Sequence, residues 1–481
     1  MKRSDNYFIR PVSDTCHRHE KSVFNVRYLM VAGIVALFIA ACTNSDEKET
    51  YNPGKSVIVT SFSPDSGGVR DMVLLDGDNF GSDPSMIRVF FNESEAKVIG
   101  STGKRILAAV PRLPGDTCIL TVEVGKQRKK YDGYFLYKVA ASVTTIAGNG
   151  TSSHVYDQGL DKAQLVPVYI GMDNNFNIFV TDNNNTLVRI NEAQNLIQVL
   201  ATADMGYNHR CIPYINPRTN VMQLGAEGQG VRDRFMFLDP KDGWAPRLKF
   251  IKEWDANGYS LPSGGTGNEV DANESHYLCL LCEADNMYYV RYRSGAIVRI
   301  DPDTWKAKII GMTPSGIAFG VAFHPARPSE MWIGYDGAAT GSTGWVANSL
   351  SRLDVLDEET TGEGANRMLA SYERLSGPIS AGHRDGPLHQ SQFNRIRMIN
   401  FDADGNLYVG DCDNHCIRRV NTNTTPMMVE TVIGIPQVGG YKDGNRDEAL
   451  FQQPHGIATD AEGVVYVAEY GNRRVRRIAI E

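Results

Sequence analysis

The sequence has few cysteines, no long helical periodicity and no excess of positive charge. Of its eight cysteines, the six that follow Cys42 lack the regular spacing of a disulfide framework, which excludes a small disulfide-stapled fold. No segment repeats apolar residues at helical spacing over a long stretch, so a helical bundle is excluded as well. With 46 glycines among 481 residues, the composition predicts a turn-rich, all-β protein that is long enough for two cores.

Motifs of common enzyme classes are also missing. The sequence contains no G-x-S-x-G elbow, no H-E-x-x-H pair and no phosphate-binding loop. These absences favour a binding function over catalysis, and no catalytic residue, cofactor or metal ion is expected.

The N-terminus has the pattern of an export signal. Six basic residues precede an apolar stretch at 28–41, which is too short to span a bilayer comfortably. This stretch ends in Ile39-Ala40-Ala41-Cys42, which resembles the cleavage box of bacterial lipoproteins. The resemblance implies a signal peptide at 1–41 and a lipid anchor on Cys42. The alternative is an ordinary signal peptide, or a weak membrane anchor, with an incidental cysteine.

A polar, acidic tether follows at 42–50. Its acidic residues resemble the surface-export tag of Bacteroidetes lipoproteins, which implies the outer face of the outer membrane. Without residues 1–41 the chain has 43 Lys and Arg residues against 53 Asp and Glu residues, a formal net charge of −10. Because phosphate binding needs a basic face, this charge argues against nucleic acid as a partner.

Residues 51–140 read as a β-sandwich of short strands separated by Gly, Pro, Asp and Asn turns. Its phrases TSFSPDSGG, LLDGDNFG, VFFNESEAKV and AAVPRLPGD resemble the IPT/TIG family of immunoglobulin-like domains. The resemblance implies a spacer or adhesion module. The expected strands are 57–62, 71–75, 87–91, 106–110, 118–124 and 134–139.

A repeat dominates the C-terminal part of the chain. Residues 393–420 and 451–478 align without a gap and are identical at ten of 28 positions, including Asn414/Asn472 and Arg418/Arg476. Each copy reads as three antiparallel strands with two tight turns, and repeats of this size usually form propellers or solenoids. The copies resemble the NHL-repeat β-propeller family, and weaker versions lie at 173–190, 218–238, 279–301 and 317–336. The resemblance predicts a six-bladed propeller at 142–481.

Polar residues of the inner strands are the candidate ligand contacts. In a propeller, the loops that join the blades converge on the central channel, where binding sites most often lie. Arg397 and its counterpart His455 would donate hydrogen bonds to a polar ligand at the channel mouth, or would line it as solvated groups. Neighbouring loops and Gly-rich segments supply further candidates, which are Arg395, His383, His389, Trp244 and Trp345.

Two cysteine pairs have alternative readings. Cys279 and Cys282 lie in an apolar run and are interpreted as buried small hydrophobic residues. In Asp411-Cys-Asp-Asn-His-Cys416, a turn held by the Asp411 and Asn414 side chains is favoured. A disulfide between Cys412 and Cys416, or a metal site, is the alternative.

Taken together, these features predict a cell-surface lipoprotein that binds an extracellular ligand without catalysis. By analogy with lipoproteins of this layout, the ligand is expected to be a glycan taken up by a polysaccharide-uptake system. One alternative is a propeller lyase or hydrolase that uses His455, Arg397 and His324. Another is a protein-binding subunit of an outer-membrane transporter complex.

The end of the chain predicts how the propeller closes. The last repeat stops one outer strand short at Glu481, and residues 142–147 resemble the outer strand that ends other blades. We expect this segment to complete the C-terminal blade, which would remove an exposed edge. Deleting 142–147 should therefore greatly lower the melting temperature measured by circular dichroism. An unchanged transition would contradict this closure.

Overall fold

The structure, a computed structural model, divides the chain into two compact units that meet near residue 140. It describes residues 49–69, 71–111, 117–137, 141–208, 210–228, 230–255, 269–337, 346–362 and 367–480. The predicted signal peptide, Cys42, most of the tether and Trp345 lie outside these ranges. None of the helices in the described ranges has the length and apolar content needed to cross a membrane.

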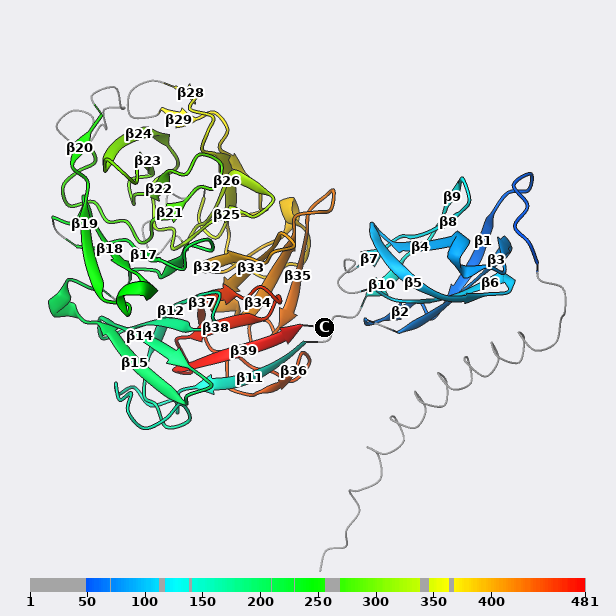
Figure 1. Ribbon diagram of the computed structural model, residues 1–481, viewed down its shortest axis with the longest axis horizontal. Helices are drawn as coiled ribbons and strands as arrows, with labels where there is room; N and C mark the ends of the chain where they lie inside the picture. Colours follow the sequence, from blue (N-terminus) through cyan, green and yellow to red (C-terminus); the bar gives the residue numbers. More distant parts are fainter. Residues whose placement is uncertain are drawn as a thin grey trace, which may run out of the picture. The chain divides into compact units, whose positions relative to one another are not determined.

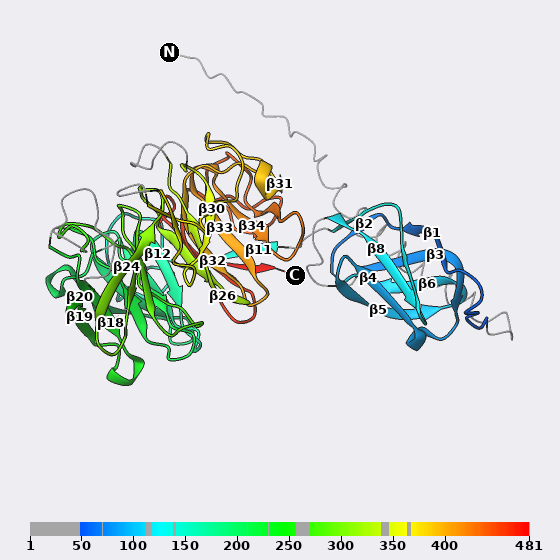
Figure 2. The same ribbon diagram turned by 90° about the horizontal axis from the view of Figure 1, so that it is seen from above.

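The first unit consists of two sheets (Figures 1 and 2). Its strands are β1 (Ile58–Ser63), β2 (Ser66–Gly67), β3 (Met72–Gly81), β4 (Ile87–Phe91), β5 (Ser94–Ser101), β6 (Gly103–Ala109), β7 (Thr117–Cys118), β8 (Leu120–Val124), β9 (Gln127–Lys130) and β10 (Phe135–Tyr137). Seven of them form one sheet in the order β1-β3-β6-β5-β4-β8-β9, and the others form the sheet β2-β10-β7. All six expected strands are present.

The seven-stranded sheet is a nearly closed barrel rather than one layer of an open sandwich. Its end strands come together, because the Gln127 side chain on β9 accepts from the Val57 amide (2.9 Å) and donates to the Lys55 carbonyl (2.8 Å). The sequence analysis missed β5 and β9. Their side chains are mostly exposed or half-buried, so neither strand shows the apolar run that marks a buried one.

The second unit contains sheets that follow one another along the chain. One sheet consists of β12 (Pro167–Met172), β13 (Ile178–Asp182), β14 (Thr186–Asn191) and β15 (Leu196–Ala201). The next consists of β16 (Tyr214–Ile215), β17 (Met222–Leu224), β18 (Arg234–Leu238) and β19 (Pro246–Phe250). It thus extends beyond the weak repeat at 218–238 on both sides.

The middle of the unit holds two more sheets. The first has the order β21 (Leu280–Leu281), β22 (Tyr288–Arg291), β23 (Ala296–Ile300), β24 (Lys306–Met312), β29 (Met368–Leu369) and β28 (Thr360–Thr361), and β20 (Glu253–Trp254) also pairs with β24. The second has the order β25 (Gly320–His324), β26 (Arg327–Gly334), β27 (Leu350–Asp354) and β30 (Glu373–Arg374).

The two strongest repeats form the last sheets. One has the order β32 (Ile396–Phe401), β33 (Asn406–Asp411), β34 (Cys416–Asn421), β35 (Met428–Ile433) and β31 (Gly386–Pro387). The other has the order β37 (Pro454–Thr459), β38 (Val465–Glu469), β39 (Arg474–Ile480), β11 (Ala141–Ala147) and β36 (Gly444–Asn445). In each of these sheets the repeat supplies three consecutive antiparallel strands, as the alignment predicts.

The first strands of the sheets surround a common channel, which is the arrangement of a β-propeller. The predicted closure is confirmed, because β11 pairs antiparallel with β39 from Ala141↔Ile480 to Ala147↔Val475. Figure 1 shows the start and the end of the unit side by side in this sheet. No long unpaired edge is left between the first and last strands of the unit.

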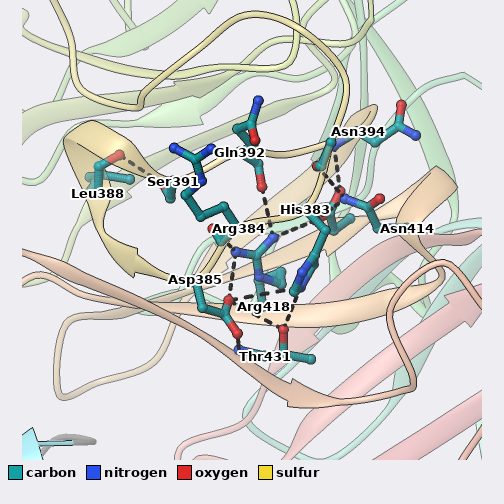
Figure 3. Close-up of polar contacts among 12 residues, drawn as sticks. His383, Arg384, Asp385, Leu388, Ser391, Gln392, Asn394, Asn414, Arg418 and Thr431 are labelled. Carbon is teal, nitrogen blue, oxygen red and sulfur yellow. Dashed lines mark hydrogen bonds and ion pairs between the residues drawn. The ribbon is translucent and has the colours of Figure 1, made fainter.

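A buried arginine fastens the loop before β32 to its sheet (Figure 3). The Arg418 side chain is fully buried and pairs with Asp411 on the neighbouring strand β33 and with Asp385 in the loop, both at 2.7 Å. It also donates to the backbone carbonyls of Gln392 (3.0 Å) and Arg384 (2.8 Å). This arginine clamp therefore joins two segments of the chain through four polar contacts in a dry environment.

The same clamp recurs around Arg476 in the last sheet. Arg476 pairs with Glu469 (2.9 Å) on β38 and with Asp443 (2.8 Å) in the loop. It donates to the carbonyls of Leu450 (3.0 Å) and Lys442 (2.8 Å). Asp385 and Asp443 each stand before a glycine in the loop that precedes a repeat, so this Asp-Gly pair and the shared arginine belong to one structural device.

The first sheet lacks the arginine but keeps the carboxylate. In this sheet Asp182 pairs with Thr186 across a turn of three residues, whereas Asp411 pairs with Cys416 across a turn of four. The shorter turn places Val188 at the position that Arg418 occupies in the later sheet. The buried Asp182 accepts a hydrogen bond from Tyr156 (2.8 Å) in the preceding loop instead, and His154 Nδ1 lies 3.0 Å from it. The loop is fastened in both cases, with different side chains.

Removing a clamp arginine should destabilise the propeller strongly. We expect Arg418→Met to lower the free energy of unfolding by about 3–5 kcal/mol, because it leaves Asp411 buried without its cation. The matched control is Arg477→Met, since Arg477 is 41% exposed and pairs with Glu192 at the surface; its loss should cost about 1 kcal/mol or less. Urea unfolding of both variants measures the difference, and equal stabilities would contradict the role of the clamp.

Candidate functional site

A cavity of about 430 Å³ lies in the central channel. Its walls come from the first strands of all the sheets in this unit, which are β12, β16, β21, β25, β32 and β37. Many lining residues stand late in these strands or in the turns that follow, such as Met172, Asn400 and Thr459, while Leu278 and Phe319 stand just before their strands. The cavity therefore occupies the end of the channel at which the first strands finish.

A layer of aromatic side chains separates the cavity from the other end of the channel. The Phe319 ring lies 4.6 Å from the Tyr277 ring and 5.4 Å from the Tyr169 ring, centroid to centroid. All three side chains are buried in one apolar cluster, together with Met398. We call this group the aromatic layer.

Two arginines and one buried aspartate lie beyond the aromatic layer. The Arg397 guanidinium stacks over the Phe319 ring at 4.9 Å and pairs with Asp336 at 3.2 Å. Arg395 contacts the same aspartate at 3.4 Å and Asp413 at 3.1 Å. The charges balance locally, so the cluster is polar without a net excess of either sign.

His455 completes this cluster, which we call the arginine end of the channel. Its ring stacks on Tyr470 with centroids 4.5 Å apart and an angle of 2° between the planes. Burial lowers the pKa of His455 well below its ordinary value, and the charges of Arg397 and Arg395 lower it further. His455 is therefore neutral, with one ring nitrogen able to accept a hydrogen bond and the other able to donate one.

Several buried polar atoms have no hydrogen-bond partner within the described ranges. They include Arg397 Nε and His455 Nδ1 at the arginine end and Tyr277 Oη in the aromatic layer, and also the Nε atoms of the clamp arginines Arg418 and Arg476. A buried polar group without a partner costs about 1–3 kcal/mol, and several such groups at one place call for a ligand or bound water. This part of the channel thus offers one donor of a guanidinium, one hydroxyl and one imidazole nitrogen to an incoming molecule.

The structure brings together Arg397, Arg395 and His455 but separates the other predicted contacts from them. His383 bonds to Thr431 (2.8 Å) on β35, three strands away from β32, and lies beside the arginine clamp (Figure 3). His389 is exposed and contacts Gln390. His324 lines the cavity at the opposite end of the channel.

Trp244 is buried and cannot stack on a sugar ring. It is 5% exposed and packs against Phe179 at 4.6 Å in the core between the first two sheets. Its Gly-rich surroundings indicate a loop, but that loop folds back over the sheet, with Trp244 itself at φ 67°. Trp345 lies outside the described ranges.

The cysteine motifs serve structure. The six described cysteines are free and buried, so Cys412 and Cys416 form no disulfide. The Asn414 amide donates to Asp411 at 2.8 Å, which confirms the hairpin held by these two side chains. Cys279 and Cys282 are fully buried, as expected for small hydrophobic residues.

Asp336, Phe319 and Tyr470 escaped the sequence analysis. Asp336 and Phe319 stand near the two ends of the degenerate repeat at 317–336, where the repeat pattern gives no reason to select either. Tyr470 stands two residues before Asn472, a turn residue that the two strongest repeats share. The only signal available was that Tyr470 follows the second strand of its repeat, at the same end of the sheet as His455.

Comparisons with known proteins agree with this architecture. Residues 57–137 match the IPT/TIG domain, and residues 451–478 match the NHL repeat. The chain contains an IPT/TIG domain and an NHL repeat. No curated protein matches the sequence.

Several solved structures share the fold over most of the chain. An auxiliary nutrient binding protein from Bacteroides ovatus is 19% identical with a TM-score of 0.54, covering 90% of this chain and 100% of that chain. Another from Bacteroides thetaiotaomicron is 19% identical with a TM-score of 0.52, covering 90% and 99%. A protein of unknown function from Bacteroides thetaiotaomicron is 20% identical with a TM-score of 0.55, covering 90% and 100%. Identities at this level establish the shared fold alone.

Buried histidines should make the stability of the propeller depend on pH. His276 is fully buried, and burial lowers its pKa to about 3. Because an unfolded histidine has a pKa of about 6.5, the unfolded chain takes up a proton first as the pH falls. The free energy of unfolding should therefore decrease below about pH 6.5, with a loss of about 2 kcal/mol from His276 between pH 7 and pH 5.

The His276→Gln variant isolates this contribution. Urea unfolding at pH 7 and pH 5 should show a smaller difference for the variant than for the unmodified protein. His389→Gln is the matched control, because that side chain is exposed and its replacement should leave the pH dependence unchanged. Identical pH dependence in all three proteins would overturn the assignment of His276 as a neutral buried group.

Proposed function

We propose that the protein is a cell-surface lipoprotein that binds an extracellular glycan at the arginine end of the channel, without catalysis. In this proposal the sheets after residue 140 are the six blades of one propeller. The segment 1–41 is the signal peptide, Cys42 carries the lipid, and the unit at 51–140 holds the propeller away from the outer membrane.

The observation that carries the proposal is the set of unpartnered polar atoms at the arginine end. Arg397, His455 and Tyr277 each keep a buried hydrogen-bonding atom without a partner in the described ranges. A binding site that presents such atoms on fixed strands needs little reorganisation when a polar ligand arrives. The ligand would satisfy groups that otherwise lower the stability of the fold.

The chemistry of the arginine end suits a sugar. Arg397 and Asp336 form an adjacent donor and acceptor, which is the pairing that two neighbouring hydroxyl groups can engage together. The stacked pair of His455 and Tyr470 adds a flat apolar surface at the same place, against which the carbon–hydrogen face of a sugar ring can pack. The local balance of charge favours a neutral glycan.

Two further findings support a role in nutrient capture. Structures with the same fold over 90% of this chain are described as auxiliary nutrient binding proteins from Bacteroides species. The lipoprotein-like Ile39-Ala40-Ala41-Cys42 and the acidic tether support a location at the cell surface. A transporter complex in the outer membrane would then be the partner that receives the glycan.

The test is a binding screen of residues 43–481 against soluble polysaccharides, with product analysis on every hit. We expect retardation in affinity electrophoresis without new products. Arg397→Ala should weaken binding of the best ligand by about 10- to 100-fold, since hydrogen bonds to a charged group contribute about 1.5–3 kcal/mol. Arg397→Lys should be nearly as damaging, because it keeps the charge but loses the planar fork.

Arg477→Ala serves as the matched control, because this exposed arginine lies on the outer part of the last sheet. Its affinity should equal that of the unmodified protein. New oligosaccharides in the product analysis would make the protein an enzyme. A complete lack of binding would direct the search to a protein partner, and either result would overturn the proposal.

A further inference from the structure

The cavity on the other side of the aromatic layer has a different chemistry from the arginine end. Its walls are mostly apolar and include Met172, Ile215, Leu281, Phe323 and Phe401. The cavity shares Phe319 and Met398 with the aromatic layer and contains neither Arg397 nor His455. The channel is thus divided into a polar end and an apolar end.

The charged groups around the cavity are already engaged. Glu283 pairs with Arg218 at 3.2 Å. The buried Asp402 accepts from the amide (2.8 Å) and the side chain (2.9 Å) of Asn406. His324 accepts from the Ala326 amide (3.1 Å) and contacts Thr422 (3.0 Å). No uncommitted charge among these groups awaits an ionic ligand.

Two uncharged polar groups on the wall are available. The side chains of Tyr214 and Asn400 line the cavity and make no hydrogen bond with any residue in the described ranges. Both are half-buried, so each can reach a molecule inside the cavity. A phenolic hydroxyl and an amide can each donate and accept, and they can therefore satisfy a hydroxyl, carbonyl or amine of a ligand.

The size and the lining of the cavity suit a small molecule. The volume of about 430 Å³ lies within the range of small-molecule pockets, which are typically apolar with a few polar groups that orient the ligand. The walls and the two free polar groups match that description.

We propose that this cavity is a second binding site, which takes an uncharged, mainly apolar small molecule with one or two hydrogen-bonding groups, such as an aromatic compound. Binding there is independent of the glycan site, because the aromatic layer stands between the two. The apolar walls contact the body of the ligand, and Tyr214 and Asn400 bind its polar group.

Fluorescence titration with N-phenyl-1-naphthylamine tests the site. This uncharged probe consists of a naphthyl group and a phenyl group joined by one amine, and its emission rises when it leaves water. We expect saturable binding with one probe per chain. Asn400→Phe should weaken binding by a factor of about ten or more, because the larger ring fills the cavity. Asn400→Ala should keep the cavity open and retain saturable binding.

The controls separate the cavity from surface binding. Phe250→Ala removes an exposed aromatic side chain on β19, 51% exposed, and should leave probe binding unchanged. Arg397→Ala should also bind the probe normally, so a failed glycan screen would not affect this result. Absence of saturable binding would overturn the proposal. So would equal affinities for Asn400→Phe and Asn400→Ala when both variants melt near the temperature of the unmodified protein.

Discussion

The arginine clamp is the interaction on which the propeller depends. A sheet of this size exposes two faces and must be joined to its neighbours at a fixed angle. In the last two sheets the clamp does this by drawing the loop before the first strand onto the second and third strands of the same sheet. The loop aspartate also reaches the fourth strand, as Asp385 accepts from the Thr431 amide on β35 and Asp443 accepts from the Thr145 amide on β11. Loop, inner strands and outer strand are thereby fixed to one another at a single point.

This arrangement explains why the channel can carry unpartnered polar groups. Inner strands that are held rigidly from outside do not need to collapse around Arg397 or His455 to satisfy them. Each such atom costs about 1–3 kcal/mol, which the packing of the whole unit has to offset. The positions of the channel residues are therefore set by the outer parts of the sheets rather than by their own contacts.

The sequence predicts the framework well and the site only in part. The repeat positions Arg418 and Arg476 are recognisable because the clamp needs an arginine and two carboxylates at fixed spacing, and the closure by 141–147 follows from a missing strand. Trp244 could not be assigned from sequence, because a Gly-rich segment looks the same whether its loop is exposed or folded back over the core. His383 was predicted at the channel mouth but bonds to Thr431 instead. The loop residues next to it, Arg384 and Asp385, belong to the clamp and hold this part of the loop away from the channel. The aromatic layer is built from side chains of three different sheets, and no local sequence pattern shows that they lie together.

The pairing of β11 with β39 means that the first strand of the propeller has no partner until β39 has been synthesised. Asn149 and Arg474, which bond across this junction, stand 325 residues apart. At synthesis rates of about 5–20 residues per second, the early strand waits for roughly a quarter of a minute to about one minute before its partner strand exists. During that time an apolar edge is available to any other strand it meets, including the same segment of a second nascent chain. The strand pairing that closes the propeller is thus also the place where two chains can exchange strands and misassemble.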